Sequence, residues 1–201
     1  MAETQTLAAV TEPARQADAG GSGEVRRPAP GSELQAVTFQ LVDAVPPRRM
    51  YQLRQGLEPE DRRRLFNRVE PELDRGLGQC WLREEPLAEI VRDCLLHYDG
   101  QRYRMHAWVI MPNHVHCLME PLAGHPIGRL LGGIKGFSAN RINKLLQRSG
   151  RVWLDGNFLS RIRSEEHFDA ALAYIHSNPL SAGLCETAHE WRWSSLHATE
   201  L

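Results

Sequence analysis

Hydrophobic residues recur along the chain at a spacing of two in some segments, as expected of strands. Around Thr38 and Gln40 every second residue is hydrophobic, which indicates a half-buried strand that begins at Leu34 and ends before Pro46. Further segments are rich in strand-forming residues, and a Pro112-Asn113 turn separates two of them. These expected strands span residues 103–111, 114–120 and 152–162.

Other segments place hydrophobic residues three and four positions apart, which predicts helices with one buried face. They span residues 60–77, 86–98 and 126–147, and a last helix starts after Ser164. Ser164 is a suitable N-cap, and the acids Glu165 and Glu166 favour the first turn. We expect this helix to end at Asn178, because a residue that precedes proline is disfavoured in helical conformation.

The order of these elements, β-α-α-β-β-α-(β)-α, predicts an α+β fold. We expect a ferredoxin-like antiparallel sheet with helices packed on one face. The first 33 residues contain Gly-Ser and Pro-Ala-Pro stretches without periodicity, so residues 1–33 are predicted to form a disordered tail. Residues 34–201 are then long enough for a single domain.

The composition narrows the class of protein. Hydrophobic residues make up 42% and charged residues 24% of 201 residues, which is typical of a globular chain. No apolar run reaches the ~18 residues that cross a bilayer, and no secretory signal pattern is present. The four cysteines show no CxxC spacing, which argues against structural zinc. We therefore expect free thiols, no membrane partner and a cytoplasmic location.

The net charge of −1 hides a local excess of basic residues. Between Pro121 and Ser164 there are eight basic residues and one acid, Asp155, so this segment carries +7 (8 − 1). Such a stretch either binds phosphates or forms a solvated helix face.

Two short motifs carry candidate chemistry. His114 and His116 lie two apart on a predicted strand, so both project to one face, as a metal-binding pair or as two surface histidines. Tyr174 and Asn178 lie four apart on the last predicted helix and share one face. They suit a nucleophile with a supporting ligand, or a packed phenol beside a helix end.

These motifs occur together with others in an order that resembles one family. The sequence from Tyr103 to Ser195 is similar to the REP-associated tyrosine transposases, relatives of the single-strand transposases of small bacterial insertion sequences. The matching segments are His106-Ala107-Trp108-Val109-Ile110-Met111-Pro112-Asn113-His114-Val115-His116, Ile134 to Asn143, Arg161 to Phe168, Tyr174-Ile175-His176-Ser177-Asn178-Pro179 and Trp191 to Ser195. With Thr38 to Asp43 and Gly78 to Leu82, the resemblance covers about 160 residues.

The resemblance implies an active site. The family's His-hydrophobe-His (HUH) motif, matched by His114 and His116, binds a divalent cation, Mg²⁺ or Mn²⁺. Tyr174 matches the catalytic tyrosine, and Asn178 stands where relatives complete the metal site with Gln or Asn. The chain departs from many relatives at Asn157-Phe158, where they carry a tyrosine that we do not take as the nucleophile.

The resemblance also implies a reaction. The chain is expected to be a tyrosine-dependent DNA transposase that nicks and rejoins single-stranded DNA through a 5′-phosphotyrosine, at palindromic repeats that fold into hairpins. Two alternatives are a hairpin-binding protein without catalysis and a metal-dependent phosphodiesterase that uses water. The expected assembly is a monomer or a homodimer.

Further side chains are candidates for contacts to DNA or for proton transfer. The expected contacts to the DNA backbone are Lys135, Arg141, Lys144, Arg148, Arg161 and Arg163. Trp153 and Phe158 are candidates for stacking on bases, whereas Phe137 is expected in the core. His167 and His176 are candidates to accept the tyrosine proton.

Overall fold

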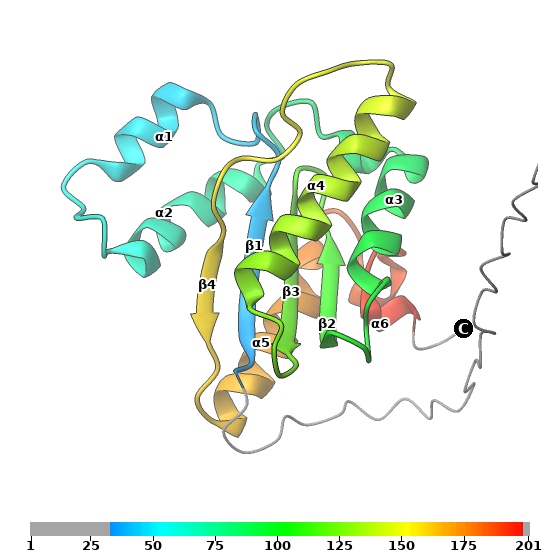
Figure 1. The fold of residues 1–201 in the computed structure, drawn as a ribbon. Coiled ribbons are helices and arrows are strands. Elements are labelled where there is room, and N and C mark those ends of the chain that lie inside the picture. The colour runs from blue at the N-terminus through cyan, green and yellow to red at the C-terminus, as the bar shows by residue number, and fades with distance from the viewer. Residues whose placement is uncertain (1–32, 199–201) are drawn as a thin grey trace, which may run out of the picture.

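A computed structural model describes residues 33–198. The tail predicted over residues 1–33 lies outside this range except for Glu33. The described chain forms a four-stranded antiparallel sheet with helices on both faces (Figure 1). The predicted α+β class with an antiparallel sheet is therefore confirmed.

The sheet has the strand order β2-β3-β1-β4. The strands are β1 (Gln35–Gln40), β2 (Tyr103–Ile110), β3 (His114–Pro121) and β4 (Phe158–Arg161). The central strands β1 and β3 are aligned so that Thr38 pairs with His116 and Gln40 with His114. Since paired residues on neighbouring strands share a face, these four side chains lie on the same side of the sheet.

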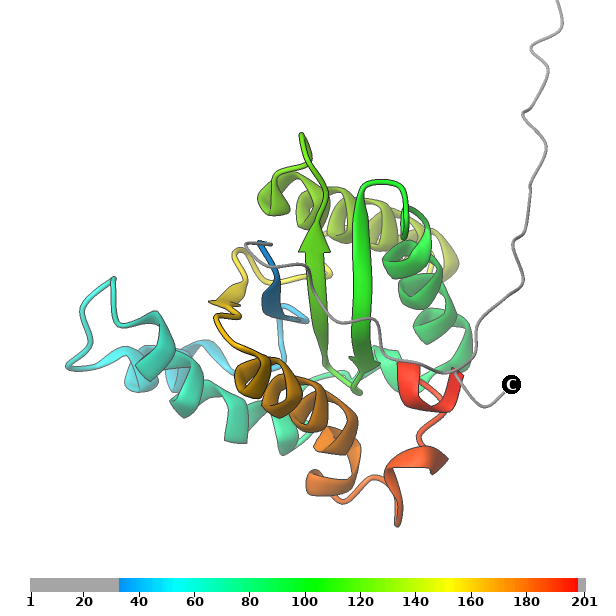
Figure 2. The same ribbon diagram turned by 90° about the horizontal axis from the view of Figure 1, so that it is seen from below.

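The main helices pack on opposite faces of the sheet, which Figure 2 shows from below. The helices α3 (Glu85–Leu96) and α4 (Ile127–Leu145) cover one face, and α5 (Glu165–Ser181) covers the other. The helix α2 (Arg62–Asp74) lies on the α5 side, where Phe66 contacts the rings of His116 and Phe158. The remaining elements are α1 (Pro47–Arg54), η1 (Trp81–Arg83), η2 (Ala188–Glu190) and α6 (Ser195–Ala198).

The strands bury hydrophobic residues on both faces, which corrects the expectation that helices pack on one face. In β3, Val115, Cys117 and Met119 face α3 and α4, whereas Leu118 packs with Phe168 and Ile175 of α5. Strands covered on both sides are hydrophobic at nearly every position, as residues 115–119 are apart from His116.

Two helix boundaries differ from the predictions. Pro47 begins α1 rather than only ending a strand, because proline at the first helical position loses no hydrogen bond. The helix α5 continues through Pro179 to Ser181 instead of ending at Asn178. Burial of Pro179, and the packing of Ala182 and Leu184 on the α5-side core, offset the disfavoured conformation before proline. The predicted N-cap is confirmed: Ser164 accepts a hydrogen bond from the His167 N–H at 3.2 Å.

Candidate active site

Two histidines at the start of β3 form the centre of the site. His114 and His116 project from β3 toward the α5 side and are 0% and 2% exposed. Their ring centroids are 4.7 Å apart and the rings are nearly perpendicular, at 88°. The alternative of two half-exposed surface histidines is therefore wrong, since both rings are fully buried.

Neighbouring side chains fix how the two rings are turned. Asn113 donates from Nδ2 to the carbonyl of Leu77 at 3.0 Å, so its Oδ1 faces His114 Nδ1 at 2.7 Å. Because Oδ1 only accepts, His114 Nδ1 carries the proton and Nε2 is left with a lone pair. His116 Nδ1 lies 2.7 Å from the hydroxyl of Thr38, which turns its Nε2 away from β1.

Burial keeps both rings uncharged. It lowers the pKa of His114 well below its usual range, and the neighbouring His116 lowers it further. Burial lowers the pKa of His116 to about 3. Neither Nε2 atom has a hydrogen-bond partner within residues 33–198, although leaving a buried polar atom unpaired costs stability. Two neutral imidazoles with free Nε2 atoms are the form in which histidine binds metals.

The helix α5 brings the other two predicted site residues to the same face of the sheet. The Tyr174 ring lies edge-on to His116, with centroids 5.3 Å apart, and Tyr174 is 37% exposed. One turn later, Asn178 is 2% exposed, and its Oδ1 has no partner in the described part of the chain. The structure thus combines a solvent-accessible phenol with buried, unpaired ligand atoms.

These donor atoms fit a divalent cation. Two imidazole nitrogens and one amide oxygen suit Mn²⁺ or Mg²⁺ and leave positions for phosphate oxygens and water. Within residues 33–198 no three His, Cys, Asp or Glu side chains are grouped to hold a metal ion. Among the buried atoms without a hydrogen-bond partner, His114 Nε2, His116 Nε2 and Asn178 Oδ1 belong to the residues that would hold such an ion.

Three polar residues near the histidines are not among the predicted site residues. Asp74, at the end of α2, places Oδ1 3.8 Å from His114 Nε2. Glu70 lies one turn earlier, and burial with the nearby Asp74 carboxylate raises the pKa of Glu70 to about 7. Gln40 is the cross-strand neighbour of His114. The four-residue spacing of Glu70 and Asp74 shows a shared helix face, but the sequence does not reveal that this face meets β3.

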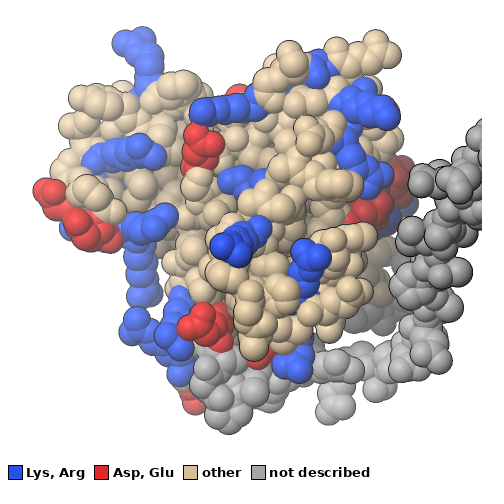
Figure 3. All heavy atoms as spheres, in the orientation of Figure 1, with Lys and Arg blue, Asp and Glu red and all other residues tan. Residues whose placement is uncertain are grey.

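The predicted DNA-contacting residues do not form one cluster. On the face with α4, Lys and Arg side chains are scattered among uncharged residues (Figure 3). Lys135 donates to two carbonyls and to Asn157 Oδ1 within the protein, and Arg148 stacks on Trp81 at 4.3 Å. Arg141 lies 4.0 Å from Asp93. Lys144, Arg161 and Arg163 are accessible.

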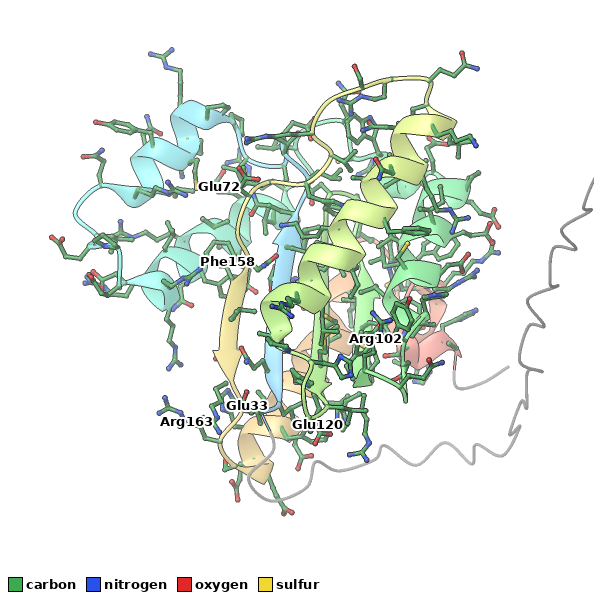
Figure 4. All side chains as sticks on the ribbon, in the orientation of Figure 1. Glu33, Glu72, Arg102, Glu120, Phe158 and Arg163 are labelled. Atoms are coloured by element: carbon green, nitrogen blue, oxygen red, sulfur yellow. The ribbon has the colours of Figure 1, made fainter. Side chains whose placement is uncertain are left out.

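The aromatic candidates lie in different environments. Trp153 is buried against Phe39 and donates to Ser138, so it is a core residue and not free to stack on a base. Phe137, expected in the core, is instead 66% exposed because it falls on the outer side of α4. Phe158 is partly buried beside α2 (Figure 4).

His176 does not face the Tyr174 hydroxyl. Its Nε2 lies 3.0 Å from the Ser195 hydroxyl, and burial lowers the pKa of His176. Residues two apart on a helix point about 200° from each other, so His176 lies on the opposite side of α5 from Tyr174. His167 is in the first turn of α5, about two turns before Tyr174.

Among residues 33–198 no helix is long and apolar enough to cross a membrane. The four cysteines, all within this range, are free, as expected.

Comparisons with known proteins agree with the predicted resemblance. Residues 80–178 match the family described as "Transposase IS200 like". No curated protein is significantly similar to the chain in sequence. Among solved structures, a REP-associated tyrosine transposase bound to a REP hairpin has the same fold, with a TM-score of 0.56 and 17% identity. The match covers 88% of this chain and 84% of that one.

A second solved structure is a candidate transposase from Deinococcus radiodurans R1, at 19% identity over 79% of this chain and 96% of that one. Its TM-score of 0.37 adds nothing to the fold assignment. The family match contains both histidines, Tyr174 and Asn178, and the fold is that of a REP-associated transposase. The resemblance predicted from the sequence motifs is confirmed by the match of residues 80–178 to the IS200-like transposase family and by the shared fold.

Proposed function

We propose that this protein cleaves and rejoins single-stranded DNA with Tyr174 as the nucleophile. The observation that carries the proposal is the accessible phenol of Tyr174 beside two buried imidazoles whose Nε2 atoms are unpaired. A buried polar atom without a partner is costly, so a constellation of three such atoms favours a bound ligand. The Tyr174 ring is 5.3 Å from the His116 ring between centroids, which supports the Tyr174 hydroxyl as the group that attacks a phosphate held at these atoms.

In the proposed reaction, Tyr174 Oη loses its proton and attacks a phosphorus atom of the DNA backbone. The new Oη–P bond replaces the P–O3′ bond, and the departing 3′-oxygen takes up a proton. The cut strand then carries a 5′-phosphotyrosine, which keeps the energy of the phosphodiester for rejoining. Attack by a second 3′-hydroxyl reverses the same exchange and releases Tyr174.

His114, His116 and Asn178 would hold Mg²⁺ or Mn²⁺. When bound, such an ion supplies positive charge to a non-bridging phosphate oxygen. Asn113 and Thr38 hold the two rings so that both Nε2 atoms remain available. The burial of both rings keeps them neutral at cellular pH, which a ligand nitrogen requires.

The DNA partner in this proposal is a palindromic repeat folded as a hairpin, with the cleavage site in a flanking single strand. The structurally similar transposase is bound to a REP hairpin. Accessible Lys144, Arg161 and Arg163 would contact the DNA backbone, whereas Lys135, Arg141 and Arg148 already have contacts within the protein. A cytoplasmic location belongs to the same proposal.

The test is a covalent-adduct assay with a labelled single-stranded hairpin oligonucleotide and Mn²⁺. Wild-type protein is expected to give a protein–DNA adduct on a denaturing gel, and Tyr174→Phe none. Tyr51→Phe removes an exposed tyrosine hydroxyl on α1 and is the matched control that keeps the adduct. Cleavage without an adduct that survives Tyr174→Phe would show hydrolysis by water, and binding without cleavage would show a DNA-binding protein.

The cation is tested in the same assay with His114→Ala. This variant is expected to lose cleavage and keep most of its affinity for the oligonucleotide. His97→Ala, which removes an exposed ring at the end of α3, is expected to cleave like wild type. Wild-type cleavage by His114→Ala would contradict the assignment of the cation ligands.

A further inference from the structure

A pocket of about 450 Å³ opens beside the histidine site, at the edge of β1. Its walls come from the end of β1, from α1 and α2 and from residues 154–158. The pocket lies where β1 loses its neighbour: β4 pairs with β1 only as far as Thr38, and Leu154 bonds to the Gln40 carbonyl at 2.9 Å. Between these two points, residues 155–157 turn away from the edge of β1, which makes room for a ligand.

The walls of this pocket are fixed by charged side chains. Lys135 holds residues 154–157 from α4 through the carbonyls of Leu154 and Gly156, at 2.8 and 2.9 Å. Arg62 reaches the Asn157 carbonyl at 3.2 Å from α2. On the other side, Arg49 of α1 binds Glu72 of α2 through two nitrogens, at 2.6 and 2.9 Å (Glu72 is labelled in Figure 4). The pocket is therefore a preformed feature of the fold.

One buried polar side chain in this pocket has no partner. Gln40 lines the pocket and is 3% exposed, yet neither its Oε1 nor its Nε2 forms a hydrogen bond with any described residue. A primary amide buried in this way loses both its donor and its acceptor interactions with water. Gln40 also pairs with His114 across β1 and β3, so its side chain lies on the face of the sheet that carries the histidines.

The charge and the lining side chains of the pocket favour a neutral, planar ligand with a polar edge. Its charged lining consists of two arginines, Arg54 and Arg62, and three acids, Glu58, Asp61 and Asp155. This lining has no net positive charge, so it is unsuited to a free phosphate. Phe158 supplies an aromatic surface and Met50 an apolar one. A nucleobase combines a flat apolar face with a neighbouring donor and acceptor, which an amide contacts with two hydrogen bonds.

We infer that this pocket binds one unpaired nucleobase of the DNA strand, with the Gln40 amide on its polar edge. The inference rests on the proposed function, because it assumes a single strand passing through the histidine site. Gln40 Nε2 donates to the base and Oε1 accepts from it, while Phe158 contacts the base face. The base next to the cleaved phosphate is thus held from β1 while the phosphate lies at His114 and His116.

The test measures binding without chemistry. Hairpin oligonucleotides are made in which each nucleotide of the single-stranded flank in turn is abasic, and their affinity for Tyr174→Phe protein is measured by fluorescence anisotropy. One abasic position is expected to weaken binding about tenfold, since a two-bond base contact contributes on this scale. Adding Gln40→Leu is expected to weaken binding of the intact strand similarly and to abolish the sensitivity at that position.

Two further variants distinguish a direct contact of Gln40 with the base from misfolding and from indirect effects. Gln40→Glu keeps the shape of the side chain but loses the donor, and is expected to show the same loss of sensitivity. Gln101→Leu, in the exposed turn before β2, is the matched control and should keep the wild-type pattern. Unchanged sensitivity to every abasic position in both Gln40 variants would overturn the inference.

The adduct assay on protein with Tyr174 intact separates this inference from the proposed function. If the adduct forms but the Gln40 variants keep the wild-type sensitivity to abasic positions, the base pocket alone is overturned. If the Gln40 variants lose that sensitivity but no adduct forms, the base pocket is retained and the tyrosine chemistry is overturned. An oligonucleotide series that does not bind at all overturns both.

Discussion

Asn113 Oδ1 accepts a hydrogen bond from His114 Nδ1 at 2.7 Å, and this contact sets which nitrogen of His114 is free. Asn113 is itself fully buried and held by its bond to Leu77, so its amide has one favourable orientation. The residue before the first histidine therefore leaves His114 Nε2 free for the ligand role that we propose.

Replacing Asn113 is expected to weaken the metal site without removing a ligand. In Asn113→Ala, His114 loses the acceptor that fixes its proton on Nδ1, so part of the population carries the proton on Nε2. Loss of such an orienting partner typically lowers metal affinity 10- to 100-fold. Titration of Mn²⁺ by calorimetry measures the effect, with Asn140→Ala on the exposed side of α4 as the control. Unchanged affinity would contradict the orienting role.

Asn178 is expected to lower the stability of the folded protein while contributing to metal binding. Its buried Oδ1 has no partner among the described residues, so the folded protein carries an unsatisfied acceptor. Asn178→Leu removes this acceptor and fills nearly the same volume. We expect the metal-free variant to gain about 1 kcal/mol in the free energy of unfolding and to bind Mn²⁺ more weakly. Urea unfolding in a chelator and calorimetry measure the two effects, and a clear loss of stability would argue that Asn178 is a packing residue.

The strand–turn–strand unit that carries the histidines was predictable because its signals are local. The segment from Tyr103 to Glu120 has strand-forming residues, a Pro-Asn turn and two histidines at a spacing of two. The structure has the same hairpin, within one residue at most boundaries. The common face of Tyr174 and Asn178 was likewise predictable, since it follows from helix periodicity alone.

What the sequence did not reveal is tertiary. Glu70 and Asp74 approach the histidines only because α2 packs on the α5 side of the sheet, and no periodicity indicates that position. Phe137 sits in a helix rich in hydrophobic residues, but the register of that helix turns it outward. The full burial of His114 depends on elements more than 30 residues away, such as α2 and α5. These relationships need the packing of distant segments, which a single sequence does not specify.

Glu70 is expected to make stability depend on pH. Burial and the nearby Asp74 raise its pKa to about 7 from the usual 4.5, so the folded state binds this proton more tightly than the unfolded chain does. The contribution of Glu70 to the free energy of unfolding therefore falls as pH rises from about 4.5 to about 7. In the absence of metal, Glu70→Gln should lose this pH dependence. At pH 8 its free energy of unfolding should be higher than that of wild type by on the order of 1 kcal/mol. Urea unfolding at pH 5 and pH 8 measures both, and identical pH profiles would contradict the raised pKa.

Two lysines on α4 are expected to behave differently, because their ammonium groups have different surroundings. Lys135 donates three hydrogen bonds to residues 154–157, and burial lowers its pKa, whereas Lys144 is accessible in the last turn. Lys135→Met should lower the free energy of unfolding by about 1–3 kcal/mol, because it leaves carbonyls of that segment without donors.

Lys144→Met should leave stability nearly unchanged and act on DNA binding instead. If its ammonium neutralises one phosphate, its loss reduces the slope of log affinity against log salt by about 0.7 for a single strand. Lys135→Met should keep the wild-type slope, because the Lys135 ammonium already donates its hydrogen bonds within the protein. Anisotropy titrations at several salt concentrations measure the slopes. A reduced slope in Lys135→Met would mean that Lys135 leaves its carbonyl partners to contact DNA, and the segment it holds would then be remodelled on binding.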